Sequence, residues 1–279
     1  VIANKESIIC GWRLIKNQLK KNKTNFIPID SEHFTIWSLL RNENIKNIKK
    51  IYLTASGGPF LNKNLYKIQN INPTFALKHP KWNMGKKISI DSATMMNKVF
   101  EIIEAKKIFN LDYDKFDIVI HPNSYVHSFI CFSTGLIKFV AHDTSMEIPI
   151  INSLHSQLEE FSYKTKKIDF NKLNKLNFSL TEKKKFPLIK ILKMIPNRDS
   201  YFEIVLVSLN DELVMRYLDR KINYISIHIL LLKLIKDPYF TKFYGKYPSN
   251  INDIKSMVKK VKIFLKNFLK KNENKISKF

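Results

Sequence analysis

The sequence predicts an α/β domain followed by a small all-α domain. In residues 1–156, short apolar runs end in polar clusters, and stretches with helical spacing separate these runs, as in open α/β sheets. After residue 185, four segments have helical spacing and none has the pattern of a strand. Apolar residues make up 44% of the 279, which is enough to form a buried core.

Strands are predicted where apolar runs or alternating patterns occur. The short apolar runs are at residues 1–3, 26–29, 51–54 and 118–120, and the alternating stretches are at 125–132 and 136–141. A helix is predicted over residues 7–20. Residues 88–90 lead into Asp91 and Ser92, which are good N-cap residues, so a second helix is predicted from there to about Phe109.

Residues 157–279 lack the strand patterns of the preceding part of the chain. Residues 157–185 have few periodic apolar positions, and we expect them to form a linker. Helices are then predicted at residues 186–194, 203–218, 225–236 and 251–269, and the lysine-rich end, 270–279, is expected to fray.

The net charge of +24 suggests a polyanionic partner, but the kind of basic residue argues against one. Only five of the 48 basic residues are arginines, the residues that read guanine edges and bind phosphates bidentately. Lysine is accompanied here by many Asn and Ile, which share A/T-rich codons, so we attribute much of the charge to genome bias. We therefore expect no nucleic-acid partner, and a nucleic-acid-binding module is kept as an alternative on charge alone.

The sequence gives few signs of a compartment, a membrane span or a nucleotide-binding loop. The two cysteines cannot make a disulfide framework and form no C-x-x-C motif, so a reducing compartment is the default expectation. The longest apolar stretch, 225–235, is too short to span a membrane, and the N-terminus lacks the features of a signal peptide, so no membrane partner is expected. Because the first residue is Val1, the chain is expected to begin inside a longer product. The six glycines form neither G-x-G-x-x-G nor a P-loop, so neither standard nucleotide-phosphate loop is present.

Asp30 and Glu32 form a D-x-E pair at the end of a predicted strand. In extended geometry their side chains point to the same side, and two carboxylates on one side repel unless a cation lies between them. A hard divalent cation such as Mg²⁺ or Mn²⁺ would fit this place. The alternative is a solvated loop.

A second group lies on the helix predicted after Asp91. Asn97, Lys98 and Glu101 share one helical face, and Ser92 stands at the predicted helix start. Ser, Asn and Lys at such a start would suit a phosphate, and Glu101 would add a third carboxylate to the metal. The alternative is an ordinary exposed face with a Lys–Glu pair.

The segment 79–85, H-P-K-W-N-M-G, is predicted to be a loop by its proline and glycine. It also carries Trp82 and Met84, and apolar residues in a loop suggest a lid that closes over a ligand. The alternative is that both side chains pack on the core. His79 alone is a weak signal.

Taken together, the motifs resemble 1-deoxy-D-xylulose 5-phosphate reductoisomerase of the non-mevalonate isoprenoid pathway. The resemblance is strong over residues 1–149 and weak beyond them. The matching strings are A-N-K-E at 3–6, P-I-D-S-E-H at 28–33, S-G-G-P-F at 56–60, H-P-K-W-N-M-G at 79–85, K-I-S-I-D-S-A-T-M-M-N-K with a following E at 87–101, and H-P-N-S-Y-V-H-S at 121–128.

The resemblance implies roles for the matching residues. The catalytic residues would be Lys5 and the metal ligands Asp30, Glu32 and Glu101. Lys5 and Ser31 would contact the hydroxyl and carbonyl end of the substrate, to which Glu32 and Glu101 would also bind. The substrate phosphate would be held by Ser56, Ser92, Asn97 and Lys98, with His79 beside them. Trp82 and Met84 would cover the carbon skeleton, and Asn4, Glu6 and Gly85 would contact NADPH.

The reaction implied by the resemblance has two steps. A metal-assisted rearrangement of the phosphorylated ketose would be followed by hydride transfer from NADPH, giving 2-C-methyl-D-erythritol 4-phosphate. The implied cofactors are NADPH and Mg²⁺, Mn²⁺ or Co²⁺. The family also implies a homodimer, in a bacterial cytoplasm or a plastid-type organelle.

The chain departs from the family pattern at its start. The family begins with a complete Rossmann-like dinucleotide-binding domain, whereas residues 1–29 match only its end, before a catalytic domain at 30–156 that would bind metal and substrate. The cofactor half is therefore expected upstream or on a second chain, and the alternative is a non-catalytic remnant. Further departures are V-S-L-N-D-E at 207–212 where the family has L-N-A-A-N-E, and Ser145 and Glu147 where acidic and basic residues are common.

Overall fold

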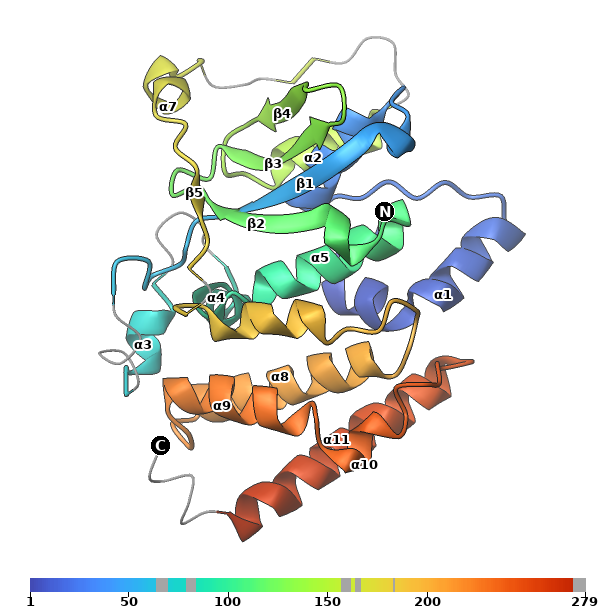
Figure 1. Cartoon of the computed structure of the whole chain (residues 1–279), viewed down its shortest axis with the longest axis vertical. Helices are drawn as coiled ribbons and strands as arrows, with labels where there is room; N and C mark the ends of the chain where they lie inside the picture. The colour runs from blue at the N-terminus through green and yellow to red at the C-terminus, as the bar shows by residue number, and fades with distance from the viewer. Residues whose placement is uncertain (64–69, 79–83, 157–161, 164–166, 183, 273–279) are drawn as a thin grey trace.

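The computed structural model describes all residues except 64–69, 79–83, 157–161, 164–166, 183 and 273–279. Figure 1 shows a β-sheet at one end of the molecule and the C-terminal helices at the other, with α5 between them. The chain is therefore an α/β protein, as the sequence predicts.

The sheet has five strands in the order β4-β3-β1-β2-β5. Strands β1 and β2 are parallel, and the other neighbouring pairs are antiparallel. The sheet is therefore mixed, and its parallel pair brings the ends of β1 and β2 to one edge. The strands are β1 (Ile48–Ala55), β2 (Phe116–Ile120), β3 (Val126–Phe132), β4 (Ile137–Ala141) and β5 (Ser179–Leu180).

The predicted strands at 51–54, 118–120, 125–132 and 136–141 are confirmed by β1 to β4, but those at 1–3 and 26–29 are wrong. Residues 1–3 have no regular structure, and residues 26–29 form no ladder with a neighbouring strand. Pro28 has no N–H group to donate to a ladder. The ring of Phe26 packs instead against that of Trp12, with 5.2 Å between the ring centres. The run at 26–29 is thus packed on helix residues rather than paired with the sheet.

The helix start predicted at Asp91 and Ser92 is also wrong, because residues 88–90 already lie in helix α4 (Lys86–Thr94). Met95 follows with a positive φ of 64° and separates α4 from α5 (Met96–Phe109). Asp91 and Ser92 thus lie inside α4 and do not cap a helix. The Ile-Ser-Ile segment at 88–90 suits an extended segment or one buried helix face equally well, and it is too short for its period to decide between them.

The remaining N-terminal elements place the site residues. Asn4 caps α1 (Lys5–Lys21) by accepting a hydrogen bond from the Ser7 N–H at 2.8 Å, and Asp30 precedes α2 (Ser31–Leu40). The predicted helix at 7–20 is confirmed. The other short elements are η1 (Ile45–Asn47), α3 (Pro73–Ala76), η3 (Tyr113–Lys115) and α6 (Glu147–Leu154).

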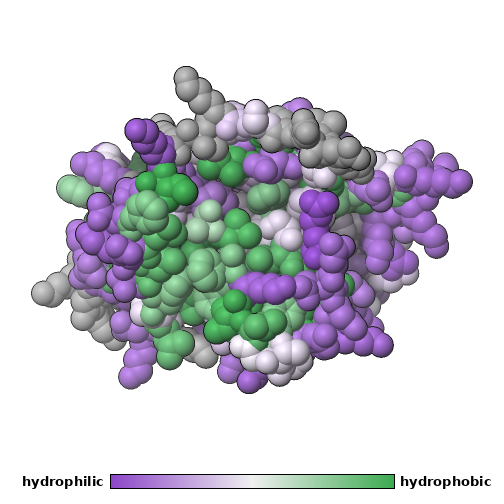
Figure 2. Space-filling model, turned by 90° about the horizontal axis from the view of Figure 1, so that it is seen from above, coloured by the Kyte–Doolittle hydropathy of each residue, from purple (hydrophilic) through white to green (hydrophobic). Residues whose placement is uncertain are grey.

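Residues 157–185, expected to be a linker, contribute regular structure to the sheet end. They contain α7 (Phe170–Asn174) and β5, whose Ser179 and Leu180 pair with β2. Figure 2 shows this end of the molecule from above, where hydrophobic residues gather on the surface. Exposed apolar side chains of the strands there include Ile137, Phe139 and Leu180.

The described residues after 185 form helices and no strand, in agreement with the sequence. Their core is shared with the first half, because Ile9 of α1 and Phe100 of α5 belong to the same buried cluster as Leu213 and Val261. In the described part of the chain, no helix is long and apolar enough to cross a membrane. The C-terminal elements are η4 (Pro187–Lys193), α8 (Phe202–Leu218), α9 (Tyr224–Leu234), α10 (Pro238–Thr241) and α11 (Ile251–Lys271).

Candidate functional site

Three carboxylates that are distant in sequence meet between α2 and α5. Asp30 precedes α2, Glu32 lies in the first turn of α2, and Glu101 lies on α5. One oxygen atom of each lies within 4.8 Å of the others, a separation that a single cation can bridge. The D-x-E pair thus reaches the same side through a helix start and not through the extended strand that the sequence suggested.

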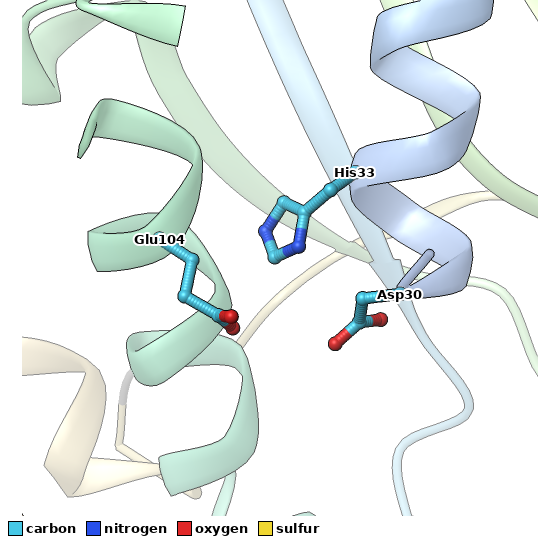
Figure 3. Close-up of side chains that lie close together, drawn as sticks. All are labelled: Asp30, His33 and Glu104. Carbon is cyan, nitrogen blue, oxygen red and sulfur yellow. The ribbon is translucent and has the colours of Figure 1, made fainter. Parts of the chain in front are cut away.

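A second cluster shares Asp30 and was not foreseen from the sequence. His33 of α2 and Glu104 of α5 each bring one ligand atom within 4.8 Å of Asp30 and of each other. Figure 3 shows the three side chains pointing toward one another from the two helices. The available signal was spacing: His33 follows Asp30 by three residues and Glu104 follows Glu101 by three, which places each pair on one helical face.

Lys5 stands among these acidic groups. Its Nζ donates to Asp30 Oδ2 at 2.6 Å and to Glu104 Oε2 at 3.0 Å, and lies 3.6 Å from Glu101 Oε1. Burial alone would lower the pKa of Lys5, but the charges of Asp30, Glu104 and Glu101 raise it well above its usual value. Lys5 is therefore held as a buried ammonium ion.

Lys98 is a second buried ammonium ion on the other side of Glu101. Its Nζ lies 2.5 Å from Glu101 Oε2 and also contacts Glu32. Burial would lower the pKa of Lys98, and the charges of Glu101 and Glu32 raise it instead. The two lysines offset part of the negative charge of the carboxylates, which would otherwise repel one another.

Burial and mutual repulsion act differently on the carboxylates themselves. Burial, followed by the charge of Glu32, raises the pKa of Glu101 to about 7. Burial would also raise the pKa of Asp30, but the adjacent Lys5 ammonium lowers it below its usual value. The site thus holds more acidic groups than its lysines neutralise, which is the electrostatic condition for binding a divalent cation.

Contacts with neighbouring elements hold α2 in place. His33 Nε2 contacts the backbone oxygen of Glu101 at 2.8 Å, and because a carbonyl only accepts, Nε2 carries the proton. Ser128 of β3 donates its hydroxyl to the backbone oxygen of Glu32 at 3.2 Å. Ser31 Oγ donates to Glu32 Oε2 at 2.7 Å, which orients that carboxylate.

The residues expected to hold a phosphate line the same cavity, whose volume is about 670 Å³. Ser56 follows β1, and the next two residues, Gly57 and Gly58, have positive φ values of 85° and 65°. A Cβ on Gly58 would lie 3.2 Å from the Ala93 Cα, so the turn after β1 packs directly on α4. The other candidates on this wall are Ser92, Asn97 and Lys98.

The cofactor candidates also line this cavity, at the start of α1 and beside α4: Asn4, Glu6 and Gly85. Met84 lines it too, whereas His79 and Trp82 lie outside the described residues, so their roles stay predictions. The Glu6 carboxylate pairs with Lys87, which also lies 2.9 Å from Asp211 Oδ1 of α8.

Two further polar groups near the site were missed from the sequence. Asn210 of α8 donates to the buried Asp91 at 2.7 Å, so the departing run at 207–212 touches the site helix α4. His127, which lines the cavity, stacks on His142 at 4.1 Å between ring centres, and burial lowers the pKa of both rings. These contacts join α4 to α8 and β3 to the loop after β4; His127 lies in the matching string at 121–128, but its pairing with His142 depends on packing.

Comparisons with known proteins show the family to which the chain is similar. Residues 26–109 match the family model for the 1-deoxy-D-xylulose 5-phosphate reductoisomerase C-terminal domain, and residues 143–264 match the DXP reductoisomerase C-terminal domain. A relative from Pelagibacter ubique with the name 1-deoxy-D-xylulose 5-phosphate reductoisomerase is 55% identical over 92% of this chain and 66% of its own length. One from Wolbachia pipientis with the same name is 43% identical over 81% of this chain and 58% of its own length.

Solved structures show the same likeness. A DOX-P reductoisomerase in complex with NADPH, fosmidomycin and magnesium is 32% identical with a TM-score of 0.87, over 96% of this chain and 69% of that one. The enzyme from Zymomonas mobilis in complex with NADPH is 30% identical with a TM-score of 0.83, over 94% and 66%. The chain spans between 58% and 66% of the length of the two curated relatives named above.

Proposed function

The chain belongs to the 1-deoxy-D-xylulose 5-phosphate reductoisomerase family, and from this premise we propose that it forms the metal- and substrate-binding part of such an enzyme. The reaction would convert 1-deoxy-D-xylulose 5-phosphate to 2-C-methyl-D-erythritol 4-phosphate in two steps, rearrangement and NADPH-dependent reduction. The observation that carries this proposal is the meeting of Asp30, Glu32 and Glu101 beside two buried lysines in one cavity.

The donor set fits a hard divalent cation. All three ligands are carboxylates, and oxygen ligands are those that Mg²⁺ and Mn²⁺ prefer. Asp30, Glu32 and Glu101 would hold Mg²⁺, Mn²⁺ or Co²⁺. When bound, the ion would polarise the substrate carbonyl and stabilise developing alkoxide charge.

The side chains around the metal ligands would bind and orient the ketose. Lys5 and Ser31 lie at the ligand cluster and would contact the oxygens of the reacting end. Ser56, Ser92, Asn97 and Lys98 would hold the phosphate, so that binding energy from a remote group orients the reacting carbons. Met84 would cover the carbon skeleton and exclude water.

NADPH would be held mainly outside these 279 residues. The sequence contains no glycine-rich phosphate loop, and Asn4, Glu6 and Gly85 offer only one edge of a cofactor site. The solved relatives bind NADPH. We propose that a dinucleotide-binding segment, upstream or on a second chain, completes the site.

The remaining assignments follow from family membership. Residues 1–29 would be the end of the dinucleotide-binding domain, 30–156 the catalytic domain, 157–185 the connection, and 186–279 a helical C-terminal domain. A homodimer is proposed, and the exposed apolar side chains of β4 and β5 supply a surface for it. The bacterial relatives make a bacterial cytoplasm the proposed location.

The test joins this chain to the preceding segment of the Pelagibacter ubique relative and follows NADPH oxidation with 1-deoxy-D-xylulose 5-phosphate and Mg²⁺. Substrate-dependent turnover is expected, with a loss of roughly 100-fold or more in Glu101→Gln. Glu43→Gln, which removes a carboxylate that pairs with Lys138 away from the cavity, is the matched control and should keep full activity. A folded fusion with no turnover would instead favour the non-catalytic remnant.

A further inference from the structure

The position of Lys5 raises a problem that the metal ligands alone do not solve. Its ammonium group contacts Asp30 and lies near Glu101, and both are proposed ligands of the divalent cation. An ammonium ion with only these partners would compete with the metal for the same oxygens, because like charges repel at such distances. Something must hold Lys5 near the metal site without taking ligands from it.

Glu104 has the properties of a residue that could hold Lys5 near the metal site. It lies on α5 close to Glu101, is 1% exposed, and accepts a hydrogen bond from Lys5 Nζ at 3.0 Å. It is not part of the Asp30, Glu32 and Glu101 group. A buried carboxylate needs a charged partner, and of the lysines with described contacts Lys5 is the one that contacts it.

His33 is the third member of the cluster that contains Asp30 and Glu104. Its ring is buried between Asp30 and Glu104 (Figure 3), and its Nε2 is engaged by the Glu101 carbonyl oxygen. Its Nδ1 has no hydrogen-bond partner among the described residues. Asp30, His33 and Glu104 have the composition of a metal site, but Lys5 Nζ already lies 2.6 Å from Asp30 and 3.0 Å from Glu104. The lysine thus takes the place that a second cation would need.

We propose that Glu104 is a positioning residue that holds the Lys5 ammonium beside the metal site, so that one lysine and one divalent cation occupy the two neighbouring clusters. The competition between Lys5 and the metal rests on the metal site of the proposed function, but it requires neither NADPH binding nor the proposed reaction. The proposal therefore makes a statement about metal affinity that can be tested without NADPH or turnover.

The test is a double-mutant cycle on the 279-residue chain with Mn²⁺ as the probe, at a pH of about 8. Free Mn²⁺ is measured by electron paramagnetic resonance for the wild type, Glu104→Gln, Lys5→Met and the double variant. In the wild-type background, Glu104→Gln is expected to weaken Mn²⁺ binding about tenfold or more, because Lys5 then moves onto Asp30 and Glu101. In the Lys5→Met background the same change should weaken it by less than about threefold.

Two outcomes would overturn the proposal. An equal or larger loss in the Lys5→Met background would show that Glu104 acts on the metal directly, and two tightly bound Mn²⁺ per wild-type chain would show that the second cluster is a metal site. Failure of the NADPH oxidation assay leaves this cycle unaffected, so the two hypotheses fail separately.

Two further variants separate the effect of the Glu104 charge on Mn²⁺ binding from an effect of misfolding. Glu104→Asp keeps the charge and should retain Mn²⁺ affinity within about threefold of the wild type; a loss as large as that of Glu104→Gln contradicts a role for the charge. Glu203→Gln is the matched control, because Glu203 is also buried and pairs with a lysine, Lys107, at 3.0 Å outside the metal ligands. Its Mn²⁺ affinity should equal that of the wild type.

Discussion

The buried charges of the site are distributed so that each lysine faces more than one carboxylate. Lys98 is 8% exposed and contacts Glu32 and Glu101, which are both proposed metal ligands. Without a metal, Lys98 is the cation that separates these two carboxylates. A divalent ion bound between them would take over part of that role.

This arrangement makes a prediction for Lys98→Met. Loss of the ammonium leaves two buried carboxylates facing each other, so the free energy of unfolding should fall by about 3 kcal/mol in metal-free buffer. Millimolar Mg²⁺ should restore a large part of this loss, since ligand binding to the folded state stabilises it. Chemical unfolding with and without Mg²⁺ measures both values.

Lys107→Met is the control for this prediction. Lys107 also joins a buried carboxylate, Glu203, and a second acid, Asp199, but neither belongs to the metal cluster. Its loss of stability should be unaffected by Mg²⁺. If Mg²⁺ rescues both variants equally, the rescue does not come from the proposed site.

The proposed metal ligands could be reached from the sequence, while most contacts of the residues around them could not. Asp30 and Glu32 form a short motif, and Glu101 shares a helical face with Asn97. His33 and Glu104 become relevant only when α2 lies against α5, and the contact of Lys5 with Glu104 joins residues 99 positions apart. Such pairs depend on packing, which no local pattern encodes.

At the scale of elements, the site depends on how the turn after β1 meets α4. Gly58 has a φ of 65°, and a Cβ there would lie 3.2 Å from both Ala93 Cα and the Ser92 backbone oxygen. The turn therefore needs glycine for its backbone conformation and for the close approach. It also fixes the distance between Ser56 and Ser92.

Gly58→Ala is predicted to lower the free energy of unfolding by about 2 to 4 kcal/mol, from the left-handed backbone and from overpacking against α4. Gly135→Ala is the matched control, because Gly135 has a φ of 90° with nothing within 4 Å of the added Cβ. That variant should lose only about 1 kcal/mol. Equal losses in urea titrations would contradict a tight contact between the turn and α4.

Elements with a clear period are predicted correctly, whereas short apolar runs predict strands correctly at β1 and β2 and wrongly at residues 1–3 and 26–29. Strands β3 and β4 alternate, and α11 repeats its buried residues at helical spacing, as at Val261 and Leu265. The segments at 26–29 and 88–90 are only four and three residues long and show no period, so extended and helical structures bury their apolar residues equally well. Tertiary packing decides which of the two structures each segment adopts.

At the scale of the whole molecule, one buried cluster connects the C-terminal helices to the helices around the site. Helices α8 and α11 pack together, and their Leu213 and Leu265 belong to the same cluster as Val99 of α5. The part of the chain after residue 185 therefore supports the helix that carries Glu101 and Glu104. We expect this part and the preceding part to unfold together.

Leu265→Ala tests this coupling. It removes a buried side chain that is 1% exposed and should lower the free energy of unfolding by about 2 to 5 kcal/mol, with circular dichroism and tryptophan fluorescence still giving coincident transitions. Ile263→Ala, on the same helix but 52% exposed, should change stability by less than about 0.5 kcal/mol. Separate transitions for the two probes would show that the helices after residue 185 form an independent domain.

The central claim is that Asp30, Glu32 and Glu101 form one divalent-cation site in this chain. The most direct test is a titration of the metal-free chain with Mn²⁺, followed by electron paramagnetic resonance, for the wild type and Glu101→Gln. The wild type should bind one Mn²⁺ per chain at a saturable site, and Glu101→Gln should weaken that binding by more than the roughly 10- to 100-fold typical of residues outside the ligand shell. No saturable site in the folded wild type, or unchanged affinity in Glu101→Gln, would contradict the claim.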